Sequence, residues 1–180
     1  TSTGAKFFAN EQAMQNLRNG KGQAVVSHVM LTAVCNHSCA FCSVQARAGD
    51  SLAFVDVCNY LGILQEYGLK AVILSGGGNP ILYKDKSTGA NFNDVVDMIN
   101  ARGLEVGLIT NGMPLRVFDF IGPRATGSGY VQTFRESWGT VRPETLDKLT
   151  WVRISMAGLD HDEREVYVPD IDPAKTALGF

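Results

Sequence analysis

The chain has 180 residues, a formal net charge of −2 and 45% hydrophobic residues. This length suits one compact domain, and the hydrophobic content allows a sizeable buried core. The near-neutral charge gives no electrostatic reason to expect nucleic acid or an anionic membrane as the main partner. No apolar run has the length that crosses a bilayer, and the start lacks the apolar segment of a signal peptide. We therefore expect neither nucleic acid nor a membrane among the partners.

Helical and strand patterns alternate along the sequence. Helices are predicted where apolar residues recur three and four positions apart, and strands where short runs are rich in Val, Ile and Leu. Ser51 and Asn91 are candidate N-caps, and Gly68 and Gly103 are candidate helix ends. No clear fifth strand follows the fourth. The expected elements are a helix over 10–19, a strand over 25–34, a helix over 51–68, a strand over 71–74, a helix over 91–103, a strand over 105–109, a short helix from Pro143 and a strand over 151–155.

This alternation predicts an α/β fold with a parallel sheet, because strands separated by helices need crossover connections. The working loops of such sheets lie at the carboxyl ends of the strands. Four conspicuous features follow four successive predicted strands, so we expect them to share one edge. They are the cysteine cluster, the glycine run Gly76-Gly77-Gly78, the pair Asn111-Gly112 and Ser155.

Three of the four cysteines lie within eight residues, with the spacing C-x3-C-x2-C at Cys35, Cys39 and Cys42. Such clustering in a large domain indicates a metal site in a reducing compartment, so we expect a cytoplasmic protein. Thiolates are soft ligands that suit iron–sulfur clusters or zinc. Three thiolates on one loop can bind three irons of a [4Fe–4S] cluster and leave the fourth iron open to a small molecule.

A zinc site is the alternative interpretation of the cluster, with His37 as a fourth ligand. Zinc sites more often use C-x2-C pairs from two separate turns, and His37 lies between two ligands, where its ring need not face the same metal. The fourth cysteine, Cys58, lies on the apolar face of a predicted helix. We expect it to be a buried structural thiol.

The cysteine cluster, with Phe41 directly before Cys42 on the loop after the first strand, resembles the signature of the radical S-adenosylmethionine (SAM) superfamily. The segment from Ser75 through the three glycines to Asn79 and Pro80 resembles the Gly-Gly-Glu-Pro element of that family, with Asn79 where Glu is usual. The resemblance implies that Phe41 lies near the adenine of the cofactor. It also implies that backbone groups of Gly76, Gly77, Gly78 and Asn79 bind the methionine amino group.

Two later strand ends extend the resemblance. Thr110-Asn111-Gly112 looks like the Thr-Asn-Gly sequence seen at the third strand end in many members, although a plain turn would give the same residues. Ser155 follows a strand that resembles the fourth strand of the family, whose Ser contacts the ribose or carboxylate of the cofactor.

The resemblance implies a partial (β/α) barrel of radical SAM type over 23–180, preceded by a helical lead-in over 1–22. The later strands of the family's barrel have no counterpart, so we expect a chain truncated after about four strand–helix units. The implied cofactors are a [4Fe–4S] cluster and S-adenosylmethionine, and the implied electron donor is flavodoxin-like or ferredoxin-like. The implied reaction cleaves SAM reductively to a 5′-deoxyadenosyl radical, which takes hydrogen from a substrate that the sequence does not identify. An inactive truncated fragment and a non-catalytic zinc module are the alternatives.

Overall fold

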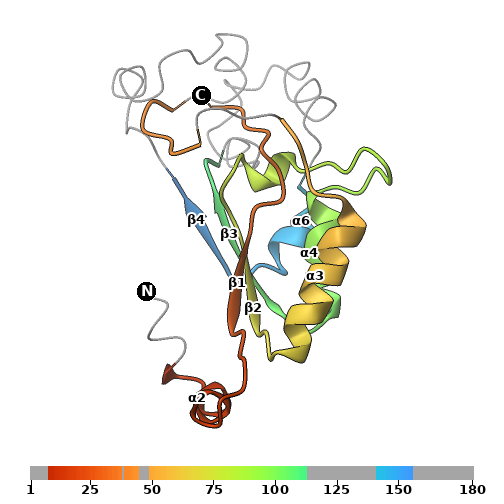
Figure 1. Cartoon of the computed structure of the whole chain (residues 1–180). Coiled ribbons are helices and arrows are strands. Elements are labelled where there is room, and N and C mark those ends of the chain that lie inside the picture. Colours follow the sequence, from red (N-terminus) through yellow and green to blue (C-terminus); the bar gives the residue numbers. More distant parts are fainter. Residues whose placement is uncertain (1–7, 38, 45–48, 113–140, 156–180) are drawn as a thin grey trace.

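The computed structural model describes residues 8–37, 39–44, 49–112 and 141–155. In this part of the chain four strands form one all-parallel sheet in the order β1-β2-β3-β4 (Figure 1). The predicted α/β class with a parallel sheet is confirmed, whereas closure into a partial barrel and the division at residue 22 stay predictions. The elements are α2 (Glu11–Arg18), β1 (Val26–Val29), α3 (Phe54–Glu66), β2 (Ala71–Leu74), a 3₁₀ helix η1 (Pro80–Leu82), α4 (Phe92–Ala101), β3 (Glu105–Thr110), α6 (Pro143–Leu146) and β4 (Trp151–Ile154).

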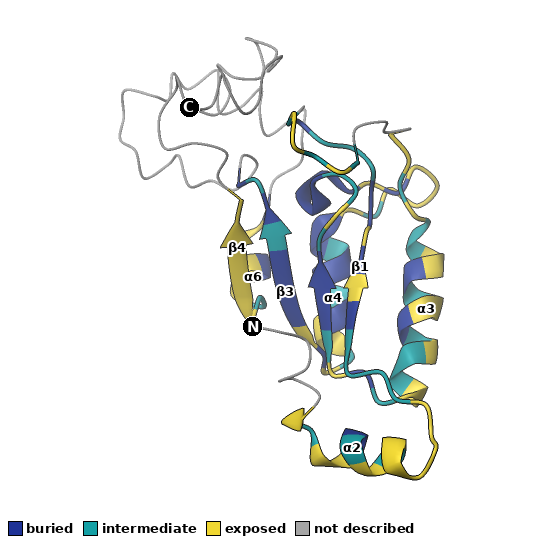
Figure 2. Ribbon diagram, turned by 60° about the vertical axis from the view of Figure 1, so that its left-hand side comes forward, coloured by how far each residue is buried: buried dark blue, intermediate teal, exposed yellow. Residues whose placement is uncertain are grey.

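Helices α3, α4 and α6 lie on one face of the sheet, and α2 lies beyond the amino ends of the strands (Figure 1). Alternate residues of the strands face the helices, and those of β2 and β3 are fully buried, as Val72 and Leu108 are. These side chains pack against apolar residues of α3 and α4, such as Leu61 and Val96, to form the core. Strand β4 is exposed along its length and is an edge of the described sheet (Figure 2). The core therefore fixes the positions of β1 to β3, and hence of the loops at their carboxyl ends.

The first strand is shorter than predicted, because it ends at Val29 rather than at residue 34. Beyond it the chain pairs with residues 50–52 instead. Ala33 N–H donates to Asp50 O at 2.7 Å, and Leu52 N–H donates to Leu31 O at 2.9 Å. The apolar residues that suggested a longer strand therefore form the stem of a loop.

The predicted N-cap at Ser51 is wrong. Helix α3 begins at Phe54, and no side chain of its N-cap residue, Ala53, makes a capping bond. The hydroxyl of Ser51 donates instead to Thr32 Oγ1 at 2.9 Å, which joins the two sides of the loop stem. Asp85 takes over the capping role from a distant part of the sequence, because its Oδ2 accepts from Phe54 N–H at 3.1 Å.

Asp85 is buried, and its carboxylate also accepts hydrogen bonds from Thr88 and Ser87. These bonds, the Thr88 hydroxyl first among them, hold the pKa of Asp85 well below its usual range. A depressed folded-state pKa contributes stability that is present above the unfolded value of about 3.9 and is lost as the pH falls below it. We expect Asp85→Asn to be less stable than the wild type at pH 7, with a difference that shrinks below about pH 4. Chemical denaturation of both proteins across this pH range measures the difference in the free energy of unfolding. A difference that does not change with pH would contradict a stabilising role for the ionised Asp85 carboxylate.

The remaining helix predictions hold. Asn91 caps α4 through a capping box with Asp94, and Pro143 occupies the first turn of α6. Cys58, expected to be buried, is partly exposed on α3. Among the described residues, no helix combines the length and the apolar character that crossing a membrane would take.

Candidate functional site

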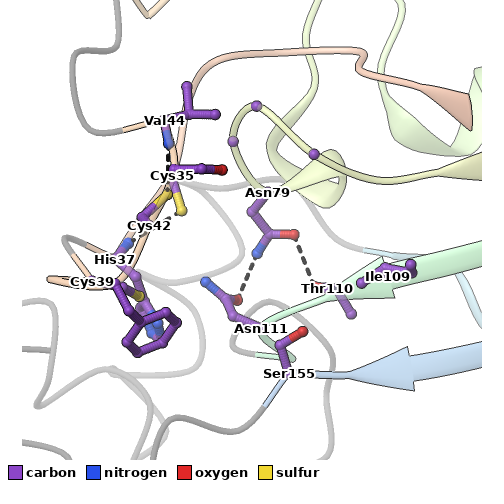
Figure 3. A pocket seen from close by; sticks show the side chains of 15 residues that line it. Cys35, His37, Cys39, Cys42, Val44, Asn79, Ile109, Thr110, Asn111 and Ser155 are labelled. Carbon is purple, nitrogen blue, oxygen red and sulfur yellow. Dashed lines mark hydrogen bonds between the residues drawn. The ribbon is translucent and has the colours of Figure 1, made fainter. Parts of the chain in front are cut away.

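A cavity of about 390 Å³ lies where the loops after the four strands meet. Figure 3 shows the cysteine loop, which we define as residues 33–44, on one side of this cavity, and Asn79 with Thr110 on the other. All ten residues that the sequence predicted for the site are in the lining. They are Cys35, Cys39, Phe41, Cys42, Gly76, Gly77, Gly78, Asn79, Asn111 and Ser155. The structure thus brings the predicted residues together, and their chemical roles stay predictions.

The cysteine loop directs backbone amides at two of its sulfur atoms. His37 N–H donates to Cys35 Sγ at 3.5 Å, and Val44 N–H donates to Cys42 Sγ at 3.4 Å. In proteins that hold iron–sulfur clusters, hydrogen bonds to the ligand sulfurs tune the potential of the cluster. A turn closed by Cys42 N–H and Cys39 O at 3.0 Å reverses the chain between the second and third cysteines. These amides and this turn therefore fix part of the loop around Cys35 and Cys42.

The separation of the ligands distinguishes two kinds of metal site. Among the described residues, no group of three or more His, Cys, Asp or Glu side chains is arranged to hold a metal ion. A zinc ion needs every ligand within about 2.0–2.3 Å of one centre. A [4Fe–4S] cluster binds each thiolate through a different iron. Thiolate ligands suit both an iron–sulfur cluster and zinc.

The glycine run packs directly against the stem of the cysteine loop. Gly78 N–H donates to Thr32 O at 2.7 Å, and Asn79 N–H donates to Val34 O at 2.8 Å. A Cβ atom on Gly78 would collide with the backbone carbonyl of Val34 and approach Ala33 C to 2.7 Å. Glycine is therefore required at position 78 by the close approach of two backbones, in addition to any contact with a ligand.

The two preceding glycines serve the turn. Gly76 and Gly77 have φ values of 72° and 62°, in the region that favours glycine. A Cβ atom on Gly77 would lie 2.8 Å from Thr32 O. Since an ammonium group only donates hydrogen bonds, the backbone groups this loop can offer a cationic amino group are carbonyl oxygens, which accept them.

A hydrogen-bonded cluster that we call the asparagine network joins the loops after β2 and β3 to the cysteine loop. Its members are Asn36, Asn79, Thr110 and Asn111. Asn79 Nδ2 donates to Asn111 Oδ1 at 2.7 Å and to Asn36 Oδ1 at 3.3 Å, while its Oδ1 accepts from the Thr110 hydroxyl at 2.8 Å. Asn111 Nδ2 donates to Asn36 Oδ1 at 2.9 Å. Figure 3 shows the bonds from Asn79 to Asn111 and Thr110.

Burial raises the free-energy cost of breaking the hydrogen bonds of the asparagine network. Asn36, Asn79 and Thr110 are only 6%, 2% and 3% exposed. A buried amide that loses its partner bears the full cost of its lost hydration. The network also accounts for an amide rather than a carboxylate at position 79. An ionised Glu has no proton to donate to the oxygens of Asn36 and Asn111, whereas the amide of Asn79 donates to both.

The remaining predicted residues complete the wall. Phe41 is 65% exposed, which leaves a large aromatic surface available to a ligand. Ser155 N–H donates to Thr110 O at 2.7 Å, so the pairing of β3 with β4 continues to the edge of the cavity. His37 also lines the cavity.

Asn36 and Thr110 belong to the site and are not predicted from the sequence. Asn36 directly follows the first cysteine, where Asn ordinarily suggests an exposed turn, and nothing in the local pattern indicates its burial. Thr110 belongs to the Thr-Asn-Gly sequence already singled out, but its hydroxyl contact with Asn79 depends on strand register. Both residues can be assigned to the site only once the pairing of β2 with β3 is known, because that pairing brings Asn79 close to Thr110 and Asn111.

Comparison with known proteins gives no family assignment. No family model matches this chain, and no curated protein matches it either. The functional interpretation therefore depends on the residues of the site.

Proposed function

We propose that the chain is a radical SAM enzyme that holds a [4Fe–4S] cluster on Cys35, Cys39 and Cys42. The observation that carries the proposal is the single cavity that these cysteines share with the glycine run and with Ser155. Together with Asn111, which lines the same cavity, these residues come from loops that follow four different strands. A metal site on the cysteine loop alone would not require the other three loops to contribute to the same wall.

The cluster would be bound through three thiolates, two of which receive amide hydrogen bonds in the structure. Three protein ligands leave one iron of a [4Fe–4S] cluster for the amino and carboxylate groups of SAM. Bound together, the cluster and SAM supply a 5′-deoxyadenosyl radical that removes hydrogen from a substrate. The protein's own contribution is to hold and orient both groups.

Residues of the chain provide a distinct support for each part of SAM. The carbonyl oxygens of Gly76 to Gly78 suit the cationic amino group, because an ammonium group donates hydrogen bonds and a carbonyl oxygen accepts them. The exposed ring of Phe41 offers a surface on which adenine can stack. Ser155 offers a hydroxyl for the ribose or the carboxylate. A flavodoxin-like or ferredoxin-like donor would supply the electron.

Iron loading of the full chain tests the ligand assignment. After anaerobic reconstitution with iron and sulfide, we expect about four irons and four sulfides per chain, with broad visible absorbance. Cys35→Ala, Cys39→Ala and Cys42→Ala should each lose most of this iron, because each removes one of three ligands. Cys58→Ala is the matched control, since Cys58 lies on α3 and is not in the lining of the cavity. One tightly held zinc per chain with no iron uptake, or equal loss in the control, would contradict the proposal.

A further inference from the structure

We propose that Asn36 positions the cysteine loop by accepting hydrogen bonds from the loops after β2 and β3. The inference rests on the proposed function in one respect, which is that the clustered thiols are cluster ligands. Asn36 lies between Cys35 and Cys39, so its place fixes the first ligand and the start of the segment that leads to the second. By this inference Asn36 is a positioning residue rather than a ligand.

The chemistry of the side chain supports this role. Its oxygen receives Asn79 Nδ2 at 3.3 Å and Asn111 Nδ2 at 2.9 Å. Asn79 and Asn111 are also bonded to each other at 2.7 Å, so the three carboxamides form a closed triangle. One oxygen thus connects the cysteine loop to two neighbouring loops; the bond with Asn79 is buried and the bond with Asn111 is part-buried.

A chain of hydrogen bonds from Gly112 to Asn36 runs through the network, and each bond in it donates in the same direction. Gly112 N–H donates to Thr110 Oγ1 at 3.1 Å, and the Thr110 hydroxyl then donates to Asn79 Oδ1. Asn79 Nδ2 donates onward to Asn111, whose own Nδ2 donates to Asn36. Each amide is polarised in the same sense, which strengthens the chain of bonds and makes Asn36 Oδ1 its final acceptor.

Backbone hydrogen bonds from the glycine run hold the stem of the loop. Bonds from Gly78 and Asn79 reach Thr32 and Val34, which precede the first cysteine. Asn36 supplies the next attachment along the chain, inside the cysteine cluster itself. Without it, we infer that the stem stays paired while the segment from 35 to 44 moves relative to the glycine run.

Asn36→Leu tests this inference, because Leu has a similar volume and lacks the acceptor. Asn36→Asp is the rescue variant, since a carboxylate keeps the oxygens that receive both amides. Asn59→Leu is the control, because Asn59 is exposed on α3, away from the cavity. The first readout is hydrogen–deuterium exchange of the metal-free full chain, compared between residues 33–44 and the strands β2 and β3.

We expect Asn36→Leu to speed exchange in the cysteine loop at least tenfold, with less than a threefold change in β2 and β3. Asn36→Asp should restore loop protection to within threefold of the wild type, and Asn59→Leu should match the wild type. Loop exchange that is unchanged in Asn36→Leu, equally fast exchange in loop and strands, or failure of the Asp variant to restore protection would each overturn the inference.

Iron content after reconstitution is the second readout. We expect Asn36→Leu to retain less than half of the wild-type iron and Asn36→Asp to retain more than Asn36→Leu. A wild type that binds no iron would refute the proposed function, while the exchange comparison would still decide whether Asn36 positions the loop. A wild type and an Asn36→Leu variant with equal iron would refute the positioning role alone.

Discussion

Replacing Gly78 by Ala is expected to destabilise the chain by about 2–3 kcal/mol and to abolish most iron uptake. The added methyl group would collide with the carbonyl of Val34, which is backbone and cannot rotate away. The glycine run would have to separate from the loop stem, which would break the bonds that Gly78 and Asn79 donate at 2.7 and 2.8 Å. Chemical denaturation and iron analysis of the same preparations measure the two effects.

Gly62→Ala is the matched control for this substitution. Gly62 lies within α3, and the nearest atom to an added Cβ is Arg102 Nη1 at 3.4 Å, at the end of a flexible side chain. Alanine in a helix interior is more favourable than glycine by about 0.5–1 kcal/mol, so this variant should gain stability and keep its iron. A Gly78→Ala variant as stable as the wild type, or a Gly62→Ala variant equally damaged, would contradict the steric argument.

The second large effect is expected from Asn79→Asp, which keeps the shape of the side chain and removes its donors. At pH 7 a carboxylate would face the oxygens of Asn36 and Asn111, which now accept at 3.3 and 2.7 Å. Losing one buried and one part-buried hydrogen bond and adding a charge at a buried position should cost on the order of 3 kcal/mol of the free energy of unfolding. We also expect the variant to load little iron, because the asparagine network would separate from the cysteine loop.

The pH dependence of Asn79→Asp provides a specific signature. Burial and facing oxygen atoms should raise the pKa of the introduced carboxyl above its unfolded value of about 3.9. The folded chain then binds more protons than the unfolded chain between these two values, so stability relative to the wild type falls as the pH rises. Denaturation curves at pH 5 and pH 7 should show the smaller deficit at pH 5. Asn59→Asp, on an exposed part of α3, should show little deficit at either pH, and a pH-independent deficit in Asn79→Asp would contradict the network.

The sequence predicted the sheet well because its strands carry clear signals. Ala71–Leu74 is a short apolar run between a helix end and a glycine run, and the structure places β2 on those residues. Asn91 and Pro143 also lie where local capping chemistry puts them. These predictions depend only on neighbouring residues, which explains why they hold.

Predictions that depended on distant partners failed or were missing. Ser51 has the local pattern of an N-cap, but Asp85 supplies the bond to Phe54 and Ser51 bonds to Thr32. In the same way the extended segment after Val29 leaves the sheet to pair with residues 50–52. The residues next to Phe54 in the sequence do not indicate that Asp85, rather than Ser51, accepts the hydrogen bond from its N–H.

The candidate site shows the same division. The alternation of strands and helices along the chain was enough to predict that the cysteines, the glycine run, Asn111 and Ser155 share one edge of the sheet. All of them line the cavity. The sequence did not predict that Asn36 is buried beneath them, or that Gly78 is required by the backbone of Val34. Both features arise from contacts between loops that are more than 30 positions apart, which the register of β1 and β2 brings together.

Release of 5′-deoxyadenosine is the most direct test of the central claim. The full chain, reconstituted anaerobically and carrying about four irons, would be incubated with a strong reductant and SAM, and the nucleoside quantified by chromatography. We predict 5′-deoxyadenosine and methionine in equal amounts from the wild type, and neither above background from Cys39→Ala. An iron-loaded wild type that releases no more 5′-deoxyadenosine than the Cys39→Ala variant would contradict the assignment of this chain as a radical SAM enzyme.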